Sequence, residues 1–272
     1  MKNIKVLVII LFIAISCQED DFDIINLNNN NITVLGHGGM GIGEKYPTNS
    51  FESILFCLNL GADGTEIDVQ MTKDSVLVAF HDEILDHSTN ISGRIFKKTW
   101  SEIENATYVG PLYTNYRLIS LDELFTNIDN LNKYIYFLDC KNFNPDTSSF
   151  YINTFNNALI KIIDKYELEN NIYIEFKRRE LIQSLKIKRP DIKIFAYSNF
   201  ATGLKLVNEL DLQGITLFVD NISKDEVLQA HYNGTMVAVL NTKTRSENIE
   251  AIRKNVDFIQ TDELKHLIKI LK

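Results

Sequence analysis

Cysteine is scarce in this sequence, which has three in 272 residues. Cys57 falls in a helical pattern and Cys140 in a strand pattern, where a single thiol is usually a small buried side chain. The spacing of the cysteines fits neither a zinc site nor a disulfide framework. With 45% hydrophobic residues, the chain has instead enough apolar side chains for a sizeable core.

Positive charge is also in deficit. The chain has 28 Lys and Arg against 36 Asp and Glu, which gives a net charge of −8. Residues 1–16 hold two lysines and no acidic residue, so the chain without them carries −10. A nucleic-acid-binding domain needs a basic surface. The acidic balance therefore excludes that class of partner and suits a divalent-cation site better.

Long hydrophobic runs are missing after the N-terminal segment, so no later span of the chain is expected to cross a membrane. No repeat of about 20 to 50 residues suggests a solenoid or propeller. The N-terminus has two lysines, the short apolar run 6–15, and small Ser16 before Cys17, as in a secretory signal. Its ending, AISC, resembles a bacterial lipoprotein signal, in which residues 1–16 are removed and Cys17 is lipidated. An ordinary secretory signal with a chance cysteine is the alternative.

The segment after this signal, QEDDFDIINLNNNN, is acidic and then rich in asparagine. Such a composition predicts a flexible tether over residues 17–31, followed by one domain over residues 32–272. A lipid anchor at Cys17 would hold that domain in a bacterial cell envelope, on the periplasmic or outer side. The oligomeric state is left open.

Apolar runs of strand length alternate with amphipathic helical patterns along the domain. Strands are predicted at 33–37, 64–69, 134–140, 171–176, 191–197, 214–220, 235–241 and 256–262, and helices at 49–60, 147–168, 178–188, 200–210, 223–232 and 246–255. Ser223 and Glu226 make a capping box at the start of one helix. Eight strands that alternate with helices over about 230 residues are typical of a TIM (β/α)8 barrel. A doubly wound open sheet is the alternative.

One apolar run departs from this alternation. VLVAF, at 76–80, follows the second strand after a connection that is too short for a helix. Parallel neighbours need a dozen or more connecting residues, so this run should return antiparallel to strand 64–69 as a hairpin. Residues 83–120 are then an irregular insertion before the third barrel strand.

The register of this hairpin decides where its polar residues point. A turn centred on Lys73 and Asp74 would pair residues whose numbers sum to 147, with Glu66 opposite His81. Side chains alternate along a strand, so Glu66, Asp68 and His81 would share one face. A slip of one residue would send His81 to the other face.

Charged side chains and histidines gather at the ends of the first three predicted barrel strands and of the hairpin. They are His37, Glu66, Asp68, His81, Asp139 and Lys141. In a barrel, the carboxyl ends of the strands meet at one mouth. Three carboxylates there would repel one another unless a cation neutralised them, and oxygen ligands without cysteine indicate Mg²⁺ or Ca²⁺. The two histidines would then be a general acid and base, and the lysine would hold an anionic oxygen.

Each of these residues alone has a purely structural explanation. The carboxylates of the second strand could pair with buried bases, and His81 could be a loop histidine paired with Asp82. Asp139 and Lys141 could be a mutual ion pair. Their combination on sequential strand ends is harder to explain by structure alone.

Several segments that carry these residues resemble one known family. They are GHGG, YPTNSFES, GADGTEIDVQMTKDSVLVAFHDEIL, LISLDELF, LDCK and FIQTDEL. Together they resemble the glycerophosphodiester phosphodiesterases, a family of the PLC-like phosphodiesterase TIM-barrel superfamily. The likeness runs from about residue 33 to residue 262, is dense between 36 and 93, and is thin after 142.

The resemblance implies a metal-dependent barrel hydrolase that releases an alcohol and sn-glycerol 3-phosphate from a glycerophosphodiester. It also implies a role for each matched residue. His37 and His81 match the catalytic histidines, Glu66, Asp68 and Asp139 the metal carboxylates, and Lys141 the phosphate-contacting lysine. Asp139 stands where the family usually has glutamate. Which histidine is the acid, and which head group the substrate carries, stay open.

The sequence also departs from the family pattern. Gly38 replaces an arginine that contacts phosphate, Thr48 a glutamate, Leu240 a tryptophan and Glu175 a common serine. Lys45 or Arg117 are candidates to supply the lost positive charge. These departures keep two alternatives open: a related phospholipase-type barrel phosphodiesterase, and a non-catalytic barrel that binds glycerophosphodiesters.

Overall fold

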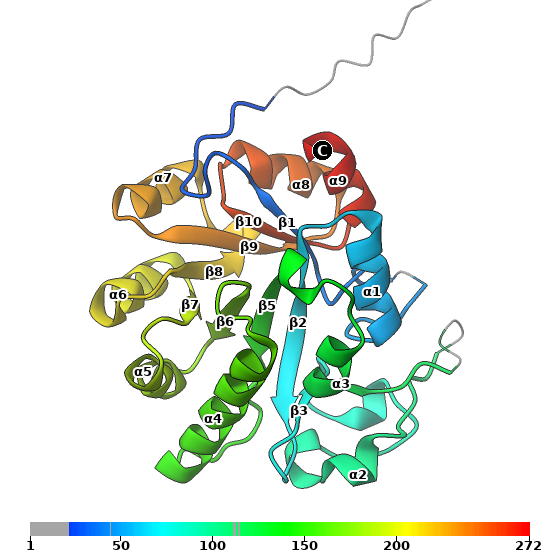
Figure 1. The fold of residues 1–272 in the computed structure, drawn as a ribbon. Coiled ribbons are helices and arrows are strands. Elements are labelled where there is room, and N and C mark those ends of the chain that lie inside the picture. Colours follow the sequence, from blue (N-terminus) through cyan, green and yellow to red (C-terminus); the bar gives the residue numbers. More distant parts are fainter. Residues whose placement is uncertain (1–21, 44, 111–112, 114) are drawn as a thin grey trace, which may run out of the picture.

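The computed structural model describes residues 22–43, 45–110, 113 and 115–272. Parallel strands form a ring with helices outside it (Figure 1). They are β1 (Thr33–Gly36), β2 (Gly64–Met71), β5 (Ile135–Cys140), β6 (Ile172–Phe176), β7 (Lys193–Tyr197), β8 (Gly214–Phe218), β9 (Met236–Thr242) and β10 (Phe258–Thr261). Each pairs with the next, and β1 pairs with both β2 and β10, which closes the ring. The predicted TIM barrel is confirmed, and the open sheet is excluded.

The helices between the strands also follow the sequence pattern. The predicted ones are α1 (Phe51–Leu60), α4 (Ser149–Tyr166), α5 (Arg179–Lys188), α6 (Phe200–Leu210), α7 (Lys224–Tyr232) and α8 (Arg245–Arg253), and α3 (Leu121–Thr126) and α9 (Leu264–Leu271) join them. The Ser50 side chain caps α1 by accepting from the Ser53 N–H, and Gly61 ends it in the left-handed region at φ 105°. The capping box of Ser223 and Glu226 is present at the start of α7.

Aromatic side chains fill much of the barrel interior. Phe137, Phe195 and Phe258 form a buried cluster there with Leu35 and Ala238. The Phe137 ring also stacks on Tyr173, with a centroid distance of 4.8 Å. These side chains fill the interior of the barrel as a packed core. Polar side chains inside the barrel are therefore left to its carboxyl-terminal mouth.

Strand β3 (Leu77–Ala79) pairs antiparallel with β2, as predicted, but in a different register. Gln70 faces Val78, so paired residues sum to 148, and the predicted pairing of Glu66 with His81 is wrong. The connection has three residues, 73–75, with Ser75 left-handed at φ 68°. The predicted turn, centred on Lys73 and Asp74, has two residues. The third residue of the observed turn moves the register by one position.

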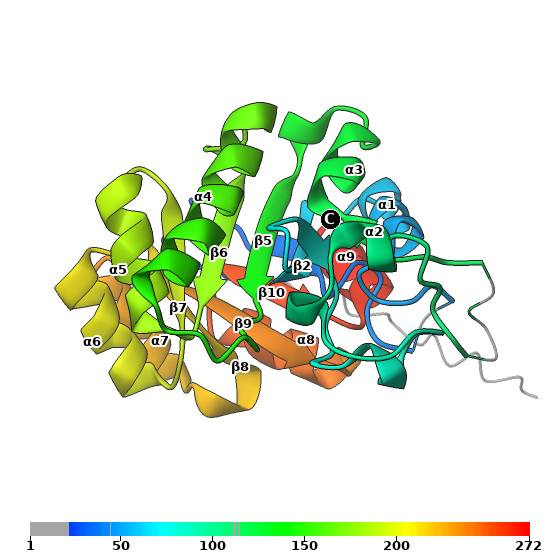
Figure 2. The same cartoon turned by 90° about the horizontal axis from the view of Figure 1, so that it is seen from below.

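Residues 83–120 form the expected small insertion beside the barrel mouth (Figure 2). The insertion contains two 3₁₀ turns at Leu85–His87 and Ile95–Lys97, the short helix α2 (Trp100–Ile103) and strand β4 (Ile119–Ser120). It has its own hydrophobic cluster, which includes Phe80, Leu85, Ile103, Tyr108 and Leu118. This cluster gives the insertion a core that is separate from that of the barrel.

The start of the described chain corrects the predicted tether over residues 17–31. The N–H groups of Ile25 and Leu27 donate to the side chains of Asn255 (3.2 Å) and Asp257 (2.9 Å). The last part of the predicted tether is therefore bound to the barrel, at the amino-terminal end of β10. The signal peptide over residues 1–16 and the lipidation site Cys17 lie outside the described residues.

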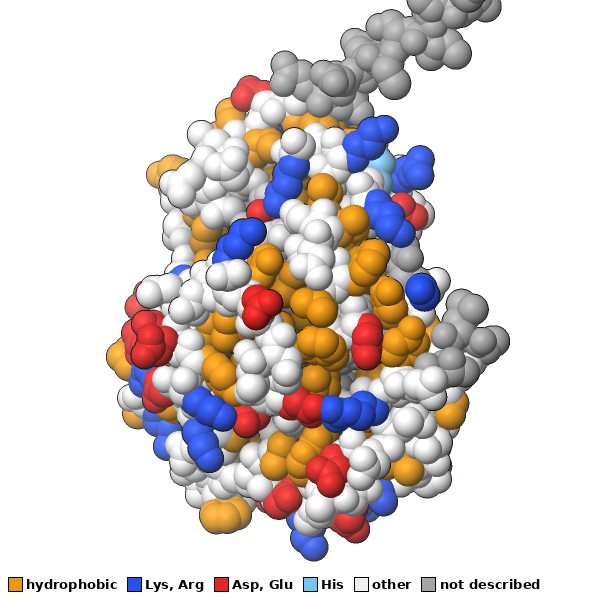
Figure 3. Space-filling view, turned by 45° about the vertical axis from the view of Figure 1, so that its right-hand side comes forward, with side chains coloured by type: hydrophobic (Ala, Val, Ile, Leu, Met, Phe, Trp, Pro, Cys, Tyr) orange, Lys and Arg blue, Asp and Glu red, His pale blue; other side chains and the backbone are white. Residues whose placement is uncertain are grey.

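The outer surface is mixed in character. On the face that carries α1 and α3, Lys and Arg side chains lie among Asp and Glu side chains, with hydrophobic patches between them (Figure 3). Among the described helices, none combines the length and the apolar character that a membrane crossing needs. Cys57 and Cys140 are both buried free thiols, as predicted.

Candidate active site

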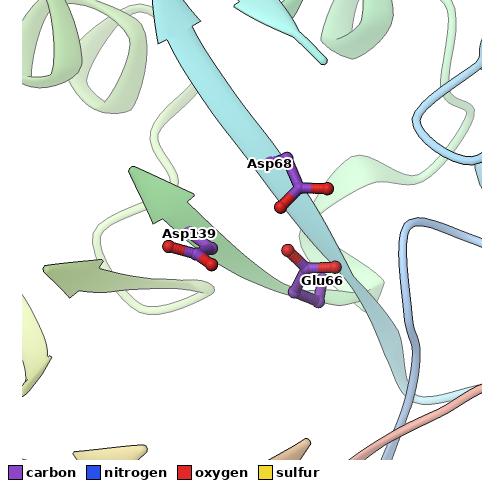
Figure 4. Close-up of side chains that lie close together, drawn as sticks. All are labelled: Glu66, Asp68 and Asp139. Carbon is purple, nitrogen blue, oxygen red and sulfur yellow. The ribbon is translucent and has the colours of Figure 1, made fainter. Parts of the chain in front are cut away.

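Three carboxylates lie together inside the mouth of the barrel. Glu66 and Asp68 point to the same side of β2 because side chains alternate, and Asp68 is directly beside Asp139 in the pairing of β2 with β5. Figure 4 shows Glu66 and Asp68 one after the other along β2, with Asp139 on the neighbouring strand. One oxygen of each lies within 4.8 Å of the others, and the residues are only 1%, 2% and 5% exposed.

Lys141 supplies the positive charge next to this group. Its Nζ lies 2.9 Å from Asp68 Oδ1 and also contacts Asp139 Oδ2. Burial would lower the pKa of Lys141, but the charges of Asp68 and Asp139 raise it above its ordinary value. Lys141 is therefore protonated at neutral pH, and its charge is shared between two carboxylates.

Backbone and amide donors fix the two carboxylates of β2. Asn49 Nδ2 donates to Asp68 Oδ2 over 2.6 Å, and Asn49 Oδ1 accepts from the Asp68 N–H over 2.9 Å. The Gly38 N–H donates to Glu66 Oε2 over 2.8 Å. Both side chains are thus oriented before any ligand arrives.

The carboxylates carry more negative charge than one lysine can neutralise. Burial and the charge of Asp68 raise the pKa of Glu66 well above its ordinary value, and burial raises the pKa of Asp139. Burial acts in the same direction on Asp68, but Lys141 and the two histidines outweigh it and lower the pKa of Asp68. A donor set of carboxylate oxygens that cannot all ionise alone fits a hard divalent cation such as Mg²⁺ or Ca²⁺.

His37 follows β1 and lies beside these carboxylates. Its Nδ1 is 2.8 Å from Asp262 Oδ1, and Asp262 follows β10, the strand next to β1. Burial opposes protonation of His37, but the hydrogen bond and charge of Asp262 and the charge of Asp68 raise its pKa. Because Asp262 holds Nδ1, the Nε2 atom is left as the reactive nitrogen.

His81 approaches from the hairpin side. Although the register differs from the prediction, β3 ends at Ala79, and His81 beyond it lines the same cavity as His37 and Asp68. Its Nδ1 lies 3.0 Å from Asp82 Oδ1, and the Ser88 hydroxyl donates to Asp82. The His81 side chain is 57% exposed, far more than the 19% of His37.

A cavity of about 440 Å³ lies between the barrel mouth and the insertion. Its walls include His37, Gly38, Asp68, Phe80, His81 and Tyr108. This volume is in the range of small-molecule sites. The imidazoles of His37, His81 and His87, a carboxylate of the acidic cluster and an opening to solvent thus meet in one space.

The structure brings together all six site residues predicted within the domain, and it adds two that the sequence did not single out. Asn49 precedes α1 in the left-handed region at φ 66°, a conformation that asparagine tolerates. Asp262 reaches His37 from the last strand. Both lie in segments that carry the family resemblance, YPTNSFES and FIQTDEL, although the resemblance was not used to give either residue a role.

Neither of the two side chains considered as replacements for the arginine missing at Gly38, Lys45 and Arg117, lies where it could supply that positive charge. Arg117 pairs with Glu123 at the start of α3. The Lys45 ammonium lies over the Tyr46 ring, 5.4 Å from its centroid. Neither belongs to the described residues that line the cavity beside Gly38.

Glu175 is a fourth carboxylate inside the barrel, and it lies on β6 beside Asp139. Its Oε1 accepts from Gln260 Nε2 over 2.8 Å and from the Thr216 hydroxyl. Its Oε2 has no hydrogen-bond partner in the described part of the chain. Burial, followed by the charge of Asp139, raises the pKa of Glu175 to about 8.

The pKa of Glu175 in the fold exceeds its ordinary value of 4.5. The contribution of Glu175 to the free energy of unfolding is therefore present below pH 4.5 and is lost as pH rises towards 8. In the metal-free protein, Glu175→Gln should reduce this loss, on the order of 3 kcal/mol by pH 8.5. The measurement is thermal unfolding in EDTA from pH 5 to 8.5. A pH slope identical to that of the unsubstituted protein would contradict the assignment.

Comparison with protein families finds a match that covers most of the chain. The sequence model of the Glycerophosphoryl diester phosphodiesterase family matches residues 40–266. A glycerophosphodiester phosphodiesterase from Caldanaerobacter subterraneus subsp. tengcongensis is 26% identical over 239 residues, which cover 85% of this chain and 95% of that protein. One from Bacillus altitudinis is 28% identical over 66% of this chain and 65% of its own.

Solved structures show the same fold. A phosphodiesterase from Oleispira antarctica, in complex with the product sn-glycerol-3-phosphate, has a TM-score of 0.78 at 17% identity, over 89% of this chain and 97% of its own. A glycerophosphodiester phosphodiesterase from Parabacteroides distasonis has a TM-score of 0.76 at 20% identity, over 89% and 97%. Both agree with the closed barrel and its interleaved helices.

Proposed function

Because the chain belongs to the glycerophosphoryl diester phosphodiesterase family, we propose that it hydrolyses glycerophosphodiesters to an alcohol and sn-glycerol 3-phosphate. The observation that carries this proposal is the meeting of His37, His81 and Asp68 in one cavity, next to Glu66 and Asp139. A non-catalytic binding barrel has no need for two imidazoles that line one cavity together with a carboxylate of the cluster.

The carboxylates of Glu66, Asp68 and Asp139 would hold a divalent cation. When bound, the cation would polarise a phosphoryl oxygen and offset the charge of the phosphodiester. Lys141, already shared by two of these carboxylates, would hold a second anionic oxygen of the same phosphoryl group. The substrate would thus be oriented by groups that are in place beforehand.

The histidines would move the protons. One accepts a proton from the attacking oxygen, which is that of water or of the glycerol 2-hydroxyl, as the new phosphorus–oxygen bond forms. The other donates a proton to the alcohol oxygen as its bond to phosphorus breaks. Attack by water would give sn-glycerol 3-phosphate directly, whereas attack by the 2-hydroxyl would give a cyclic phosphate, which water would then open by attack on phosphorus to give the same product. Asp262 would keep the His37 ring in one tautomer and orientation, as Asp82 would for His81.

The test is release of sn-glycerol 3-phosphate from glycerophosphocholine and glycerophosphoethanolamine. We expect turnover that EDTA abolishes and that added Mg²⁺ or Ca²⁺ restores. Turnover that is unaffected by EDTA would contradict the role of the cation. Tight binding of sn-glycerol 3-phosphate without turnover of any diester would favour a binding barrel over an enzyme.

We also propose that Cys17 is the lipidated first residue of a protein anchored in a bacterial envelope. Support comes from the AISC sequence at the end of the N-terminal apolar run. Labelling with a radioactive fatty acid should mark the unsubstituted chain and not Cys17→Ser. Equal labelling of both would contradict the anchor.

A further inference from the structure

The insertion contributes a buried phenol whose hydroxyl is unpaired. Tyr108 is 6% exposed, and its hydroxyl finds no hydrogen-bond partner among the residues the structure describes. An unpaired buried hydroxyl costs stability, and a phenylalanine at this position would avoid that cost. Native structures keep few such groups, and those that they keep often have a functional reason.

The surroundings of Tyr108 connect it to the reaction centre. Tyr108 lines the cavity together with His37, Asp68 and His81. Its ring packs near Phe80, with a centroid distance of 6.2 Å, inside the cluster that forms the core of the insertion. Its position is set by this cluster and by its backbone, so the hydroxyl is held in place without a polar partner.

The local charges keep this hydroxyl a donor. Burial, followed by the charges of Asp68 and Asp82, raises the pKa of Tyr108 far above its ordinary value. The phenol therefore retains its proton at neutral pH. A neutral O–H group beside an anion-binding centre can pair with an anionic oxygen without the desolvation cost of burying another charge.

We propose that Tyr108 is a substrate-binding residue whose hydroxyl donates a hydrogen bond to a phosphoryl oxygen of the bound phosphodiester. This inference rests on the proposed function for the identity of the ligand. A phosphoryl oxygen fits better than the head group because Asp68, whose charge acts on Tyr108, also belongs to the carboxylate cluster. No lysine or arginine of the described residues lines the cavity, and Gly38 brings no side chain to its wall, so Tyr108 would add a donor to the one that Lys141 supplies.

The test is Tyr108→Phe, which removes one oxygen and keeps the ring. We expect kcat/KM to fall by about 10- to 100-fold, as for the loss of a hydrogen bond to a charged group. The loss should be the same for glycerophosphocholine and glycerophosphoethanolamine, which share the phosphoryl group and differ in the head group. The midpoint of thermal unfolding should stay equal or rise, because an unpaired buried hydroxyl is removed.

The matched control is Tyr116→Phe, on the same insertion and packed against the same cluster. It should change neither kcat/KM nor binding. Unchanged kcat/KM in Tyr108→Phe would overturn the inference, as would a loss confined to one head group. An equal loss of kcat/KM in Tyr116→Phe, or a lowered unfolding midpoint in Tyr108→Phe, would instead indicate a structural role and overturn it too.

Calorimetric binding of sn-glycerol 3-phosphate separates this inference from the proposed function. Weaker binding by Tyr108→Phe than by the unsubstituted protein supports the inference even if no diester is turned over. Equal binding by the two proteins overturns it, even if the unsubstituted protein is an active phosphodiesterase.

Discussion

Glu66→Gln is expected to abolish cation binding and to lower kcat/KM by at least about a thousandfold, since a bound cation contributes several kcal/mol to such reactions. Glu66 is 1% exposed and faces Asp68 and Asp139. Glutamine keeps an oxygen that can accept from the Gly38 N–H, so the local structure should persist. The substitution removes one of the three carboxylates that would hold the cation.

Thermal unfolding with and without the cation provides the measurement. At a cation concentration of about a hundred times its Kd, the unsubstituted protein should gain about 3 kcal/mol, and Glu66→Gln should gain nothing. In EDTA the variant should be at least as stable as the unsubstituted protein, because burial raises the pKa of Glu66 and its ionisation near neutral pH costs stability.

The exposed Glu169 gives a matched control on the loop before β6. Glu169→Gln loses the same charge and should keep both the cation-dependent gain and the activity. If Glu66→Gln retained the stabilisation by Mg²⁺ or Ca²⁺, the carboxylate cluster would not be the cation site.

His37→Ala is expected to lower kcat by about 10² to 10⁴, the usual contribution of a positioned acid or base. His37 faces the cavity and is held by Asp262 through Nδ1. KM should change far less than kcat, because the carboxylates and Lys141 that bind the substrate stay in place. Steady-state kinetics measures both, and added imidazole should restore part of the rate.

Two further variants test the explanation. His231→Gln changes a histidine that pairs with Asp257 at the amino-terminal end of β10, remote from the mouth, and should leave kcat unchanged. Asp262→Asn should move one limb of the pH–rate profile to lower pH, since Asp262 raises the pKa of His37. A His37→Ala enzyme with nearly full kcat would remove this histidine from the chemistry.

The barrel and the strand ends of the site could be predicted because both depend on local patterns. Each strand is a short apolar run between helical patterns, and its length fixes where its carboxyl end falls. Glu66 and Asp68, two residues apart on one strand, must share a face. That Asp139 lies on the strand next to them follows from the order of the strands in the barrel.

The register of the β2–β3 hairpin was mispredicted by one residue, for a local reason that the sequence does not display. Ser75 takes a left-handed conformation that serine adopts infrequently, and this adds a third residue to the turn. His81 still reaches the cavity because the strand ends before it and alternation no longer applies.

Other contacts lie beyond sequence reasoning because they join distant segments. Asp262 and His37 are 225 residues apart, and only the closure of the barrel brings β10 next to β1. The bonds from Ile25 and Leu27 to the loop before β10 likewise span 230 residues. An asparagine-rich composition alone gives no indication of such partners.

The attachment of residues 25–28 next to Asn255 and Asp257 has a geometric consequence for any anchor upstream of them. The chain leaves the barrel at the amino-terminal end of its strands, whereas the histidines and carboxylates lie at the carboxyl-terminal end. The eight residues from Cys17 to Ile25 extend no further than roughly 30 Å. A bilayer that holds Cys17 would then lie at the end of the barrel opposite the cavity. The cavity would bind molecules from the surrounding solution rather than lipids of that bilayer.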